Sequence, residues 1–95
     1  MQMSRVEGSD YGAIKLFTLS TCVWCKKTKT LLQEMNVGYE YVDVDLLEGA
    51  DREKVLDELK TFNPRCSFPS LVVNDDCIVG YEENKIKEAL QRPWK

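Results

Sequence analysis

The feature that most constrains the fold is an apolar run at residues 13–19 that ends just before a Cys-x-x-Cys motif, formed by Cys22 and Cys25. The run has the length and composition of a largely buried strand. Ser20 and Thr21 then supply side-chain oxygens that can cap a helix beginning near Cys22. The two thiols are therefore expected about one helical turn apart at a strand-to-helix corner, where they can close into a small disulfide ring and open again.

Two further elements follow from the periodicity of the next residues. The helix is expected to run from near Cys22 to Gly38, because apolar side chains recur at helical spacing and a glycine commonly ends a helix. The alternating residues 39–46 predict a second strand with Val42, Val44 and Leu46 on one face. A strand, a helix and a strand in this order predict parallel pairing through a right-handed crossover.

The C-terminal half predicts a helix, a hairpin and a last helix. Acidic residues favour a helix start near residue 48, and the sequence at 63–64, Asn-Pro, ends that helix. The apolar stripe of this helix is formed by Val55, Leu56, Leu59 and Phe62. Residues 70–73 and 77–79 predict two short strands that pair antiparallel around the turn at 74–76. The last helix uses an apolar stripe and is closed by Pro93. The fold class is thus α/β, in the order β-α-β-α-β-β-α, with a four-stranded mixed sheet flanked by helices.

Length and charge limit the other possibilities. Ninety-five residues make one domain, which an arm at residues 1–12 precedes; we expect this arm to be frayed or only partly ordered. The net charge of −3 disfavours broad binding to nucleic acid or to anionic membranes. No apolar run approaches the roughly 20 residues that span a bilayer, and the arm has no apolar signal core. We therefore expect a cytoplasmic monomer with no nucleic-acid or membrane partner.

The cysteines carry the chemistry that this composition allows. The chain has no histidine, which excludes a Cys-His pair, a Ser-His-Asp triad and a histidine-rich metal site. A zinc site would need a second ligand pair, and Cys66 and Cys77 are eleven residues apart. An inert buried pair is the other alternative. A Cys-x-x-Cys motif in a short βαβ protein favours a redox-active pair over both alternatives.

The expected corner also predicts different roles for the two thiols. The thiolate is the attacking species, and the first turn of a helix favours an anion. We therefore expect Cys22 to have a depressed pKa and to act as the nucleophile, with Cys25 as the resolving thiol. Lys26 is expected to tune the pKa of Cys22, with Lys27 and Lys29 adding positive potential. The simplest interpretation of these lysines is a solvated helix face, with the electrostatic tuning as a by-product.

Three motifs in the correct order resemble the glutaredoxin family, within the thioredoxin-fold superfamily. Residues 17–25 resemble the family's strand and active-site corner, Phe68 and Pro69 fall at its cis-proline, and residues 77–80 resemble the strand end before its glycine-containing turn. The resemblance covers roughly residues 14–90. It implies a thioredoxin-like fold, with residues 13–95 as the glutaredoxin-like domain, and a thiol-disulfide oxidoreductase and electron carrier that acts on disulfide-containing proteins.

The resemblance also implies a substrate groove beside the thiols. Pro69 in cis would leave the backbone at Phe68 free to pair with an extended substrate segment. Gly80 would allow close approach of a peptide or of glutathione, although an ordinary turn proline and turn glycine remain alternatives. Trp24, between the cysteines, is assigned to a docking surface, the alternative being packing on its own helix. Tyr81 is expected to flank the same groove.

Glu82 completes the expected groove, although this part of the chain departs from the family's glutathione site. Many members have a lysine at the position of Leu19 and a basic residue at the position of Cys66. Many also have a Gly-Gly pair before acidic residues, where this chain has Gly80 and Tyr81. These departures imply reduced dependence on glutathione.

The chain therefore resembles the thioredoxin-like dithiol subgroup, whose members take electrons from a protein reductase. A thioredoxin-reductase-like flavoenzyme or a ferredoxin-dependent enzyme is the expected source. A glutathione-dependent glutaredoxin and an iron–sulfur cluster carrier are the alternatives. We expect no cofactor, with glutathione as the cosubstrate left open. Cys66 is either a third redox-active thiol or a small buried residue, and Cys77 is assigned to the core.

Overall fold

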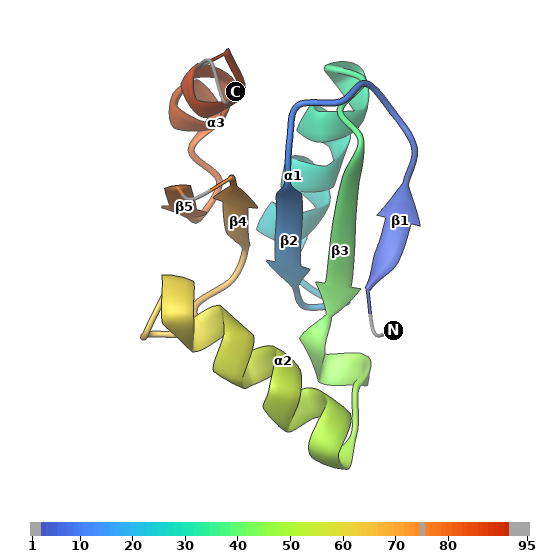
Figure 1. Ribbon diagram of the computed structural model, residues 1–95, viewed down its shortest axis with the longest axis vertical. Helices are drawn as coiled ribbons and strands as arrows, with labels where there is room; N and C mark the ends of the chain where they lie inside the picture. Colours follow the sequence, from blue (N-terminus) through green and yellow to red (C-terminus); the bar gives the residue numbers. More distant parts are fainter. Residues whose placement is uncertain (1–2, 75, 92–95) are drawn as a thin grey trace.

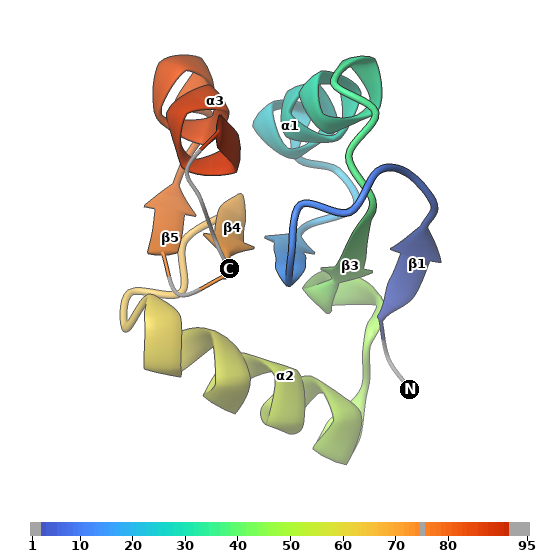
Figure 2. The same cartoon turned by 45° about the horizontal axis from the view of Figure 1, so that its top comes forward.

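A computed structural model describes residues 3–74 and 76–91 and arranges them in three layers (Figure 1). Figure 2 shows the sheet between α1 and α3 on one face and α2 on the other. The strand order is β1-β3-β2-β4-β5. The elements are β1 (Ser4–Val6), β2 (Ile14–Thr18), α1 (Val23–Glu34), β3 (Tyr39–Asp43), the 3-10 helix η1 (Val44–Leu46), α2 (Gly49–Phe62), β4 (Ser70–Val73), β5 (Asp76–Val79) and α3 (Glu83–Gln91).

The pairing of the central strands confirms the predicted topology. β2 pairs parallel with β3, and Leu16 lies opposite Tyr41. β4 pairs antiparallel with β2 on one side and with β5 on the other. The α/β fold is therefore a thioredoxin-like arrangement in which β2, the strand that leads to the cysteines, is central.

The sheet has five strands, so the predicted number of four was wrong. The additional strand, β1, pairs antiparallel with the outer edge of β3, with Arg5 opposite Glu40. Ser9 continues the attachment, because its backbone exchanges hydrogen bonds with Asn36 and Gly38 at 2.8 and 2.9 Å. A three-residue edge strand has almost no sequence pattern of its own, and the free hydrogen-bonding groups of its neighbour order it.

α1 ends at Glu34, four residues before the predicted stop at Gly38. Asn36 adopts a φ of 55° and takes the role that the prediction gave to glycine. The N–H of Val37 donates to the carbonyl of Leu32 at 2.9 Å, and that of Asn36 to the carbonyl of Gln33 at 3.0 Å. These two bonds form a Schellman motif, which satisfies carbonyls at the helix end.

The strand predicted at residues 39–46 is shorter than expected. β3 ends at Asp43, where its register with Thr18 of β2 also ends. The following residues turn into η1, which buries Val44 but leaves Leu46 66% exposed. The predicted shared face of these two side chains was therefore wrong, because the strand alternation does not continue past the sheet.

Two apolar clusters hold the layers together. The cluster under α1 and α3 is built from strand residues such as Leu16 and Leu71 with Leu32 and Ile86. The cluster under α2 contains Phe17, Val42, Val55, Leu59 and Val72.

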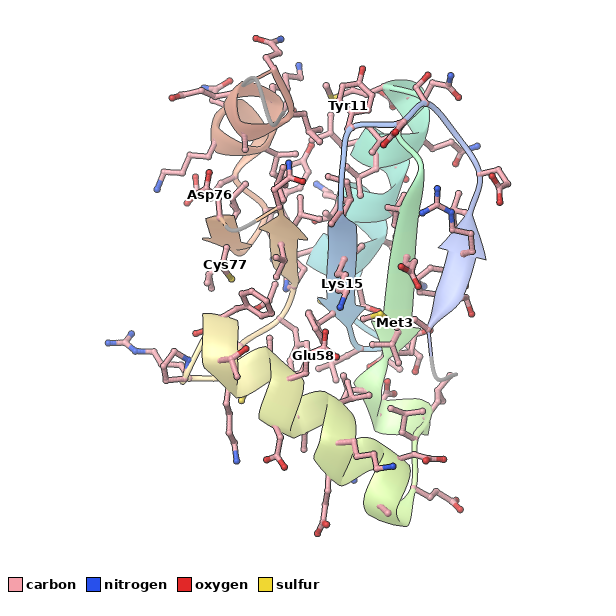
Figure 3. The ribbon with its side chains drawn as sticks, in the orientation of Figure 1. Met3, Tyr11, Lys15, Glu58, Asp76 and Cys77 are labelled. Atoms are coloured by element: carbon pink, nitrogen blue, oxygen red, sulfur yellow. The ribbon has the colours of Figure 1, made fainter. Side chains whose placement is uncertain are left out.

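An ion pair reinforces the α2 side. The ammonium of Lys15 on β2 lies 2.7 Å from the Glu58 carboxylate on α2 (Figure 3).

The stripe predicted for α2 and its end before Asn63 are confirmed. The predicted end of α3 at Pro93 lies outside the described residues. No helix within residues 3–74 and 76–91 combines the length and apolarity that a bilayer crossing requires.

Candidate active site

The thiol pair lies at the corner between β2 and α1, as predicted. Cys22 is the N-cap of α1, and its Sγ accepts a hydrogen bond from the N–H of Cys25 at 3.2 Å. The N–H of Cys22 in turn donates to the carbonyl of Leu19 at 3.2 Å. Cys22 is half-buried, whereas Cys25 is only 1% exposed. An incoming sulfur can therefore reach Cys22 far more easily than Cys25.

The environment of Cys25 keeps its thiol protonated. Burial, together with the hydrogen bond and charge of Cys22, raises the pKa of Cys25 to about 12. The backbone at Leu19 and the ammonium of Lys29 act in the opposite direction. The pair therefore has an accessible sulfur at the helix N-terminus and a buried sulfur one turn further, which suits an attacking and a resolving thiol.

The three lysines after the motif have different surroundings. Lys27 lies over the indole ring of Trp24, with its Nζ 4.7 Å from the ring centroid. Lys29 pairs with Asp43 on β3 at 3.6 Å. Lys26 is exposed and lines an open groove between α1 and α3. The role predicted for Lys26 at Cys22 stays a prediction.

A small groove brings together most of the predicted substrate-binding residues. Its volume is about 260 Å³, and its lining comes from α1, from the loop before β4 and from the turn after β5. The lining residues are Trp24, Phe68, Pro69, Gly80 and Tyr81. The peptide bond between Phe68 and Pro69 is cis. Segments distant in the sequence thus form one surface beside the cysteines.

Glu82 is the predicted groove residue that does not line this groove. Its side chain is exposed, and its carbonyl accepts a hydrogen bond from the N–H of Ile86 at 2.9 Å. Gly80, by contrast, lines the groove with a φ of 82°, and its N–H donates to the carbonyl of Pro69 at 2.8 Å. Apart from Gly80 and its two chain neighbours, none of the described residues places an atom within 4 Å of the position that a Cβ at Gly80 would occupy. The backbone conformation of the turn accounts for this glycine.

An aromatic stack forms one wall of the groove. The rings of Trp24 and Tyr81 have centroids 6.0 Å apart and an interplanar angle of 24°. The Tyr81 hydroxyl donates to Glu83 at 3.0 Å, and Lys87 donates to the same carboxylate at 3.0 Å. Neither Glu83 nor Lys87 was predicted to belong to this wall of the groove, although their spacing is that of a helical ion pair.

The remaining cysteines do not line this groove. Cys66 has a φ of 51° and packs, together with Cys77, at the edge of the apolar cluster under α2. Burial raises the pKa of the Cys77 thiol. All four cysteines are free thiols. In the part of the chain that the structure describes, His, Cys, Asp and Glu side chains nowhere gather in threes as metal ligands.

Comparison with known proteins agrees with this geometry. A family model described as glutaredoxin matches residues 14–78, which is more than half of the chain. The chain belongs to the glutaredoxin family. As a glutaredoxin, it is a thiol-disulfide oxidoreductase with the redox pair Cys22 and Cys25 and with protein disulfides as its substrate class.

Solved archaeal structures are similar to this glutaredoxin over most of its length. The glutaredoxin from Methanosarcina mazei Go1 is 45% identical, with a TM-score of 0.87, and the match covers 97% of this chain and 90% of that chain. The methanoredoxin of Methanosarcina acetivorans is 49% identical, with a TM-score of 0.84, and the match covers 90% of each chain.

A curated bacterial relative is also similar to this glutaredoxin. It is the uncharacterized glutaredoxin-like 8.6 kDa protein in the rubredoxin operon of Clostridium pasteurianum. The two are 30% identical over 79 residues, which is 83% of this chain and 99% of the relative.

Proposed function

We propose that this glutaredoxin reduces protein disulfides by a dithiol mechanism and is recycled by a protein reductase, with little dependence on glutathione. The Cys22 thiolate attacks one sulfur of the substrate disulfide, which forms a mixed disulfide and releases the other substrate sulfur as a thiolate. The Cys25 thiolate then attacks Cys22 Sγ, so that the substrate leaves fully reduced and a Cys22–Cys25 disulfide remains. Two electrons pass from the protein to the substrate.

The observation that carries the dithiol mechanism is the contrast between the two sulfurs. Cys22 Sγ lies at the helix N-terminus and is reachable from outside, whereas Cys25 is 1% exposed one turn further into the helix. A mixed disulfide therefore forms at Cys22, and Cys25 is close enough to displace the substrate within the same molecule. Effective concentrations of such intramolecular groups are high.

The groove supports a protein substrate. Exposed aromatic surface on Trp24 and the neighbouring groove lined by Phe68 and Pro69 offer an apolar contact area beside the reacting sulfur. An extended segment can pair with backbone groups at such a position, and its disulfide would then lie next to Cys22. We assign substrate binding to the five lining residues and, outside the groove, to Glu82.

The weak glutathione dependence rests on the groups available near the groove. Leu19 stands where glutathione-using relatives often carry a lysine, and it offers no charge for a carboxylate. Glu83, in the first turn of α3, is already bound by Tyr81 and Lys87. Neither position therefore offers a free charge to a tripeptide that carries two carboxylates and an ammonium group.

Trapping tests the dithiol mechanism. In Cys25→Ser, the mixed disulfide with a protein substrate should accumulate and be visible by mass spectrometry, whereas Cys22→Ser should form no such adduct. Reduction of protein disulfides by Cys22→Ser at the wild-type rate would refute the mechanism.

Reconstitution tests the source of electrons. The oxidised protein is supplied either with glutathione and glutathione reductase, or with a thioredoxin-reductase-like or ferredoxin-dependent reductase. We expect turnover with a protein reductase at least about tenfold above that with glutathione. Robust turnover with glutathione alone would overturn the second half of the proposal and leave the dithiol mechanism intact. An iron–sulfur cluster carrier would absorb visible light after anaerobic purification. A protein that only cycles two thiols would be colourless.

A further inference from the structure

The resolving step sets an electrostatic problem that the dithiol mechanism leaves open. Cys25 must become a thiolate before it can attack Cys22 Sγ. Its thiol is only 1% exposed, and burial, which persists when Cys22 is bound to the substrate, raises its pKa. A nearby positive charge would favour the thiolate that the step requires.

Lys29 lies where such a charge can act. It follows Cys25 by four residues on α1, so the two side chains lie on the same helix face, one turn apart. The other charged or polar groups that act on the thiol are Cys22 and the backbone at Leu19. Of these groups, Lys29 alone carries a positive charge.

Contacts with β3 hold the Lys29 side chain in place. Its Nζ lies 3.6 Å from Asp43 Oδ1 and 4.1 Å from the centroid of the Tyr41 ring, both on β3. The carboxylate of Asp43 also accepts a hydrogen bond from the Thr18 hydroxyl on β2, and Thr18 is fully buried. Lys29 and Asp43 are themselves largely buried, with side chains 28% and 18% exposed. The ammonium is therefore less free than that of a solvated surface lysine.

We propose that Lys29 is a positioning residue for the resolving step, and that its ammonium, held by Asp43 and Tyr41, stabilises the thiolate that Cys25 forms. This inference rests on the proposed dithiol mechanism. In the step, Cys25 loses its proton to solvent and its sulfur bonds to Cys22 Sγ. The bond between Cys22 and the substrate breaks, and the departing substrate thiolate takes up a proton. The same charge stabilises the Cys25 thiolate when a reductase opens the Cys22–Cys25 disulfide.

The test separates the two chemical steps with one reagent. The reduced protein is mixed with less than one equivalent of dithiobis(nitrobenzoate). The attack of Cys22 releases one coloured thionitrobenzoate in a phase whose rate depends on concentration. Resolution by Cys25 releases the second in a phase that is independent of concentration.

We expect Lys29→Met to slow the second phase about three- to tenfold, while the first phase changes by less than about twofold. An opposite charge at this range lowers a thiol pKa, and the gain in thiolate is partly offset by lower nucleophilicity. The rate profile of the second phase should also move to higher pH. Lys29→Arg keeps the charge and should restore the rate. Lys54→Met removes a lysine charge from α2, on the other face of the sheet, and controls for the loss of one positive charge.

Three results would overturn the assignment: a second phase of Lys29→Met at the wild-type rate, Lys29→Arg as slow as Lys29→Met, or an unchanged pH profile. A single phase in the wild-type protein, with no second release, would instead refute the dithiol mechanism itself. If Lys29→Met does not fold, the comparison uses titration of thiolate absorbance in Cys22→Ser against Cys22→Ser/Lys29→Gln. There, an unchanged titration of Cys25 contradicts the proposal and a shift to higher pH supports it.

Discussion

Trp24 stacks on Tyr81 with ring centroids 6.0 Å apart, so one of the two residues between the cysteines contacts the turn that leads into α3. Trp24 nevertheless remains 54% exposed. The indole therefore packs across two elements and still presents a face to an incoming protein. Trp24 therefore packs on Tyr81, in the turn after β5, and not only on its own helix. Its role in docking stays a prediction.

Removal of the indole should selectively weaken the binding of protein substrates. We expect Trp24→Ala to raise the KM for a protein disulfide about fivefold or more, because exposed aromatic anchors dominate such contacts. The rate with a small disulfide such as hydroxyethyl disulfide should change by less than about twofold. Steady-state assays with both substrates check this, with Trp24→Phe as the control that keeps an aromatic ring. An equal loss with both substrates would place Trp24 in the chemistry of Cys22 and contradict docking.

Asp45 should contribute stability that depends on pH. Hydrogen bonds from the side chain and backbone of Ser20 lower the pKa of Asp45 below its ordinary value of 3.8. Because the folded value is the lower one, this stabilisation is fully present above pH 3.8 and is lost as the pH falls through the folded value. Ser20→Ala should therefore lower the midpoint of urea unfolding at pH 7. Below the folded pKa of Asp45, the midpoint of the variant should approach that of the wild type.

The neighbouring substitution Thr21→Ala provides the control for this measurement, because Thr21 is exposed and the hydrogen bonds to the Asp45 carboxylate come from Ser20. If Ser20→Ala lowers the urea midpoint by the same amount at neutral and at acid pH, the lost stability does not come from the ionised carboxylate.

A pair of identical substitutions tests the end of β3. Leu59 is fully buried under the sheet, and Leu46 on η1 is 66% exposed. We expect Leu59→Ala to lower the free energy of unfolding by about 2–5 kcal/mol. Leu46→Ala should change it by less than about 0.5 kcal/mol. Chemical denaturation measures both, and a large loss in Leu46→Ala would instead support a strand that continues through residue 46.

Gly80 should be required for its backbone conformation. Its φ of 82° is unfavourable for a residue with a Cβ, yet the position of that Cβ meets no other atom of the protein. Gly80→Ala should therefore cost about 1–2 kcal/mol of stability without a steric clash. Gly80→Asn, which tolerates this region better, should recover part of the loss. Thermal and chemical unfolding of both variants check this, and an unchanged stability of Gly80→Ala would contradict it.

The sequence predicts the local parts of this structure well because their signals are local. The apolar run at 13–19 and the thiol spacing place Cys22 at a strand-to-helix corner, and the structure confirms that corner. The predicted capping by Ser20 or Thr21 was wrong, because Cys22 itself is the N-cap and Ser20 bonds to Asp45. The apolar stripe of α2 and its end before Asn63 were predictable for the same reason. The resemblance to glutaredoxins then suggested the groove residues, five of which form one lining.

Contacts between distant segments escaped prediction. β1 exists because β3 offers a free edge, and β3 ends where its partner β2 ends, so neither boundary is encoded in its own residues. The pairs that shape the site, Trp24 with Tyr81 and Lys29 with Asp43, join residues that are far apart in the chain. Periodicity indicates which face of an element is buried but not which neighbour it meets.

The sequence by itself thus determined the order of the strands and helices from β2 to α3, the cysteine corner and the chemical class, because these depend on residues within a few positions of one another. The tertiary structure alone decided how buried Cys25 is, which carboxylate holds Lys29 and which ring meets Trp24. Those properties depend on how α1 packs against β2, β3 and the turn before α3, and a one-dimensional pattern contains no distances between such segments.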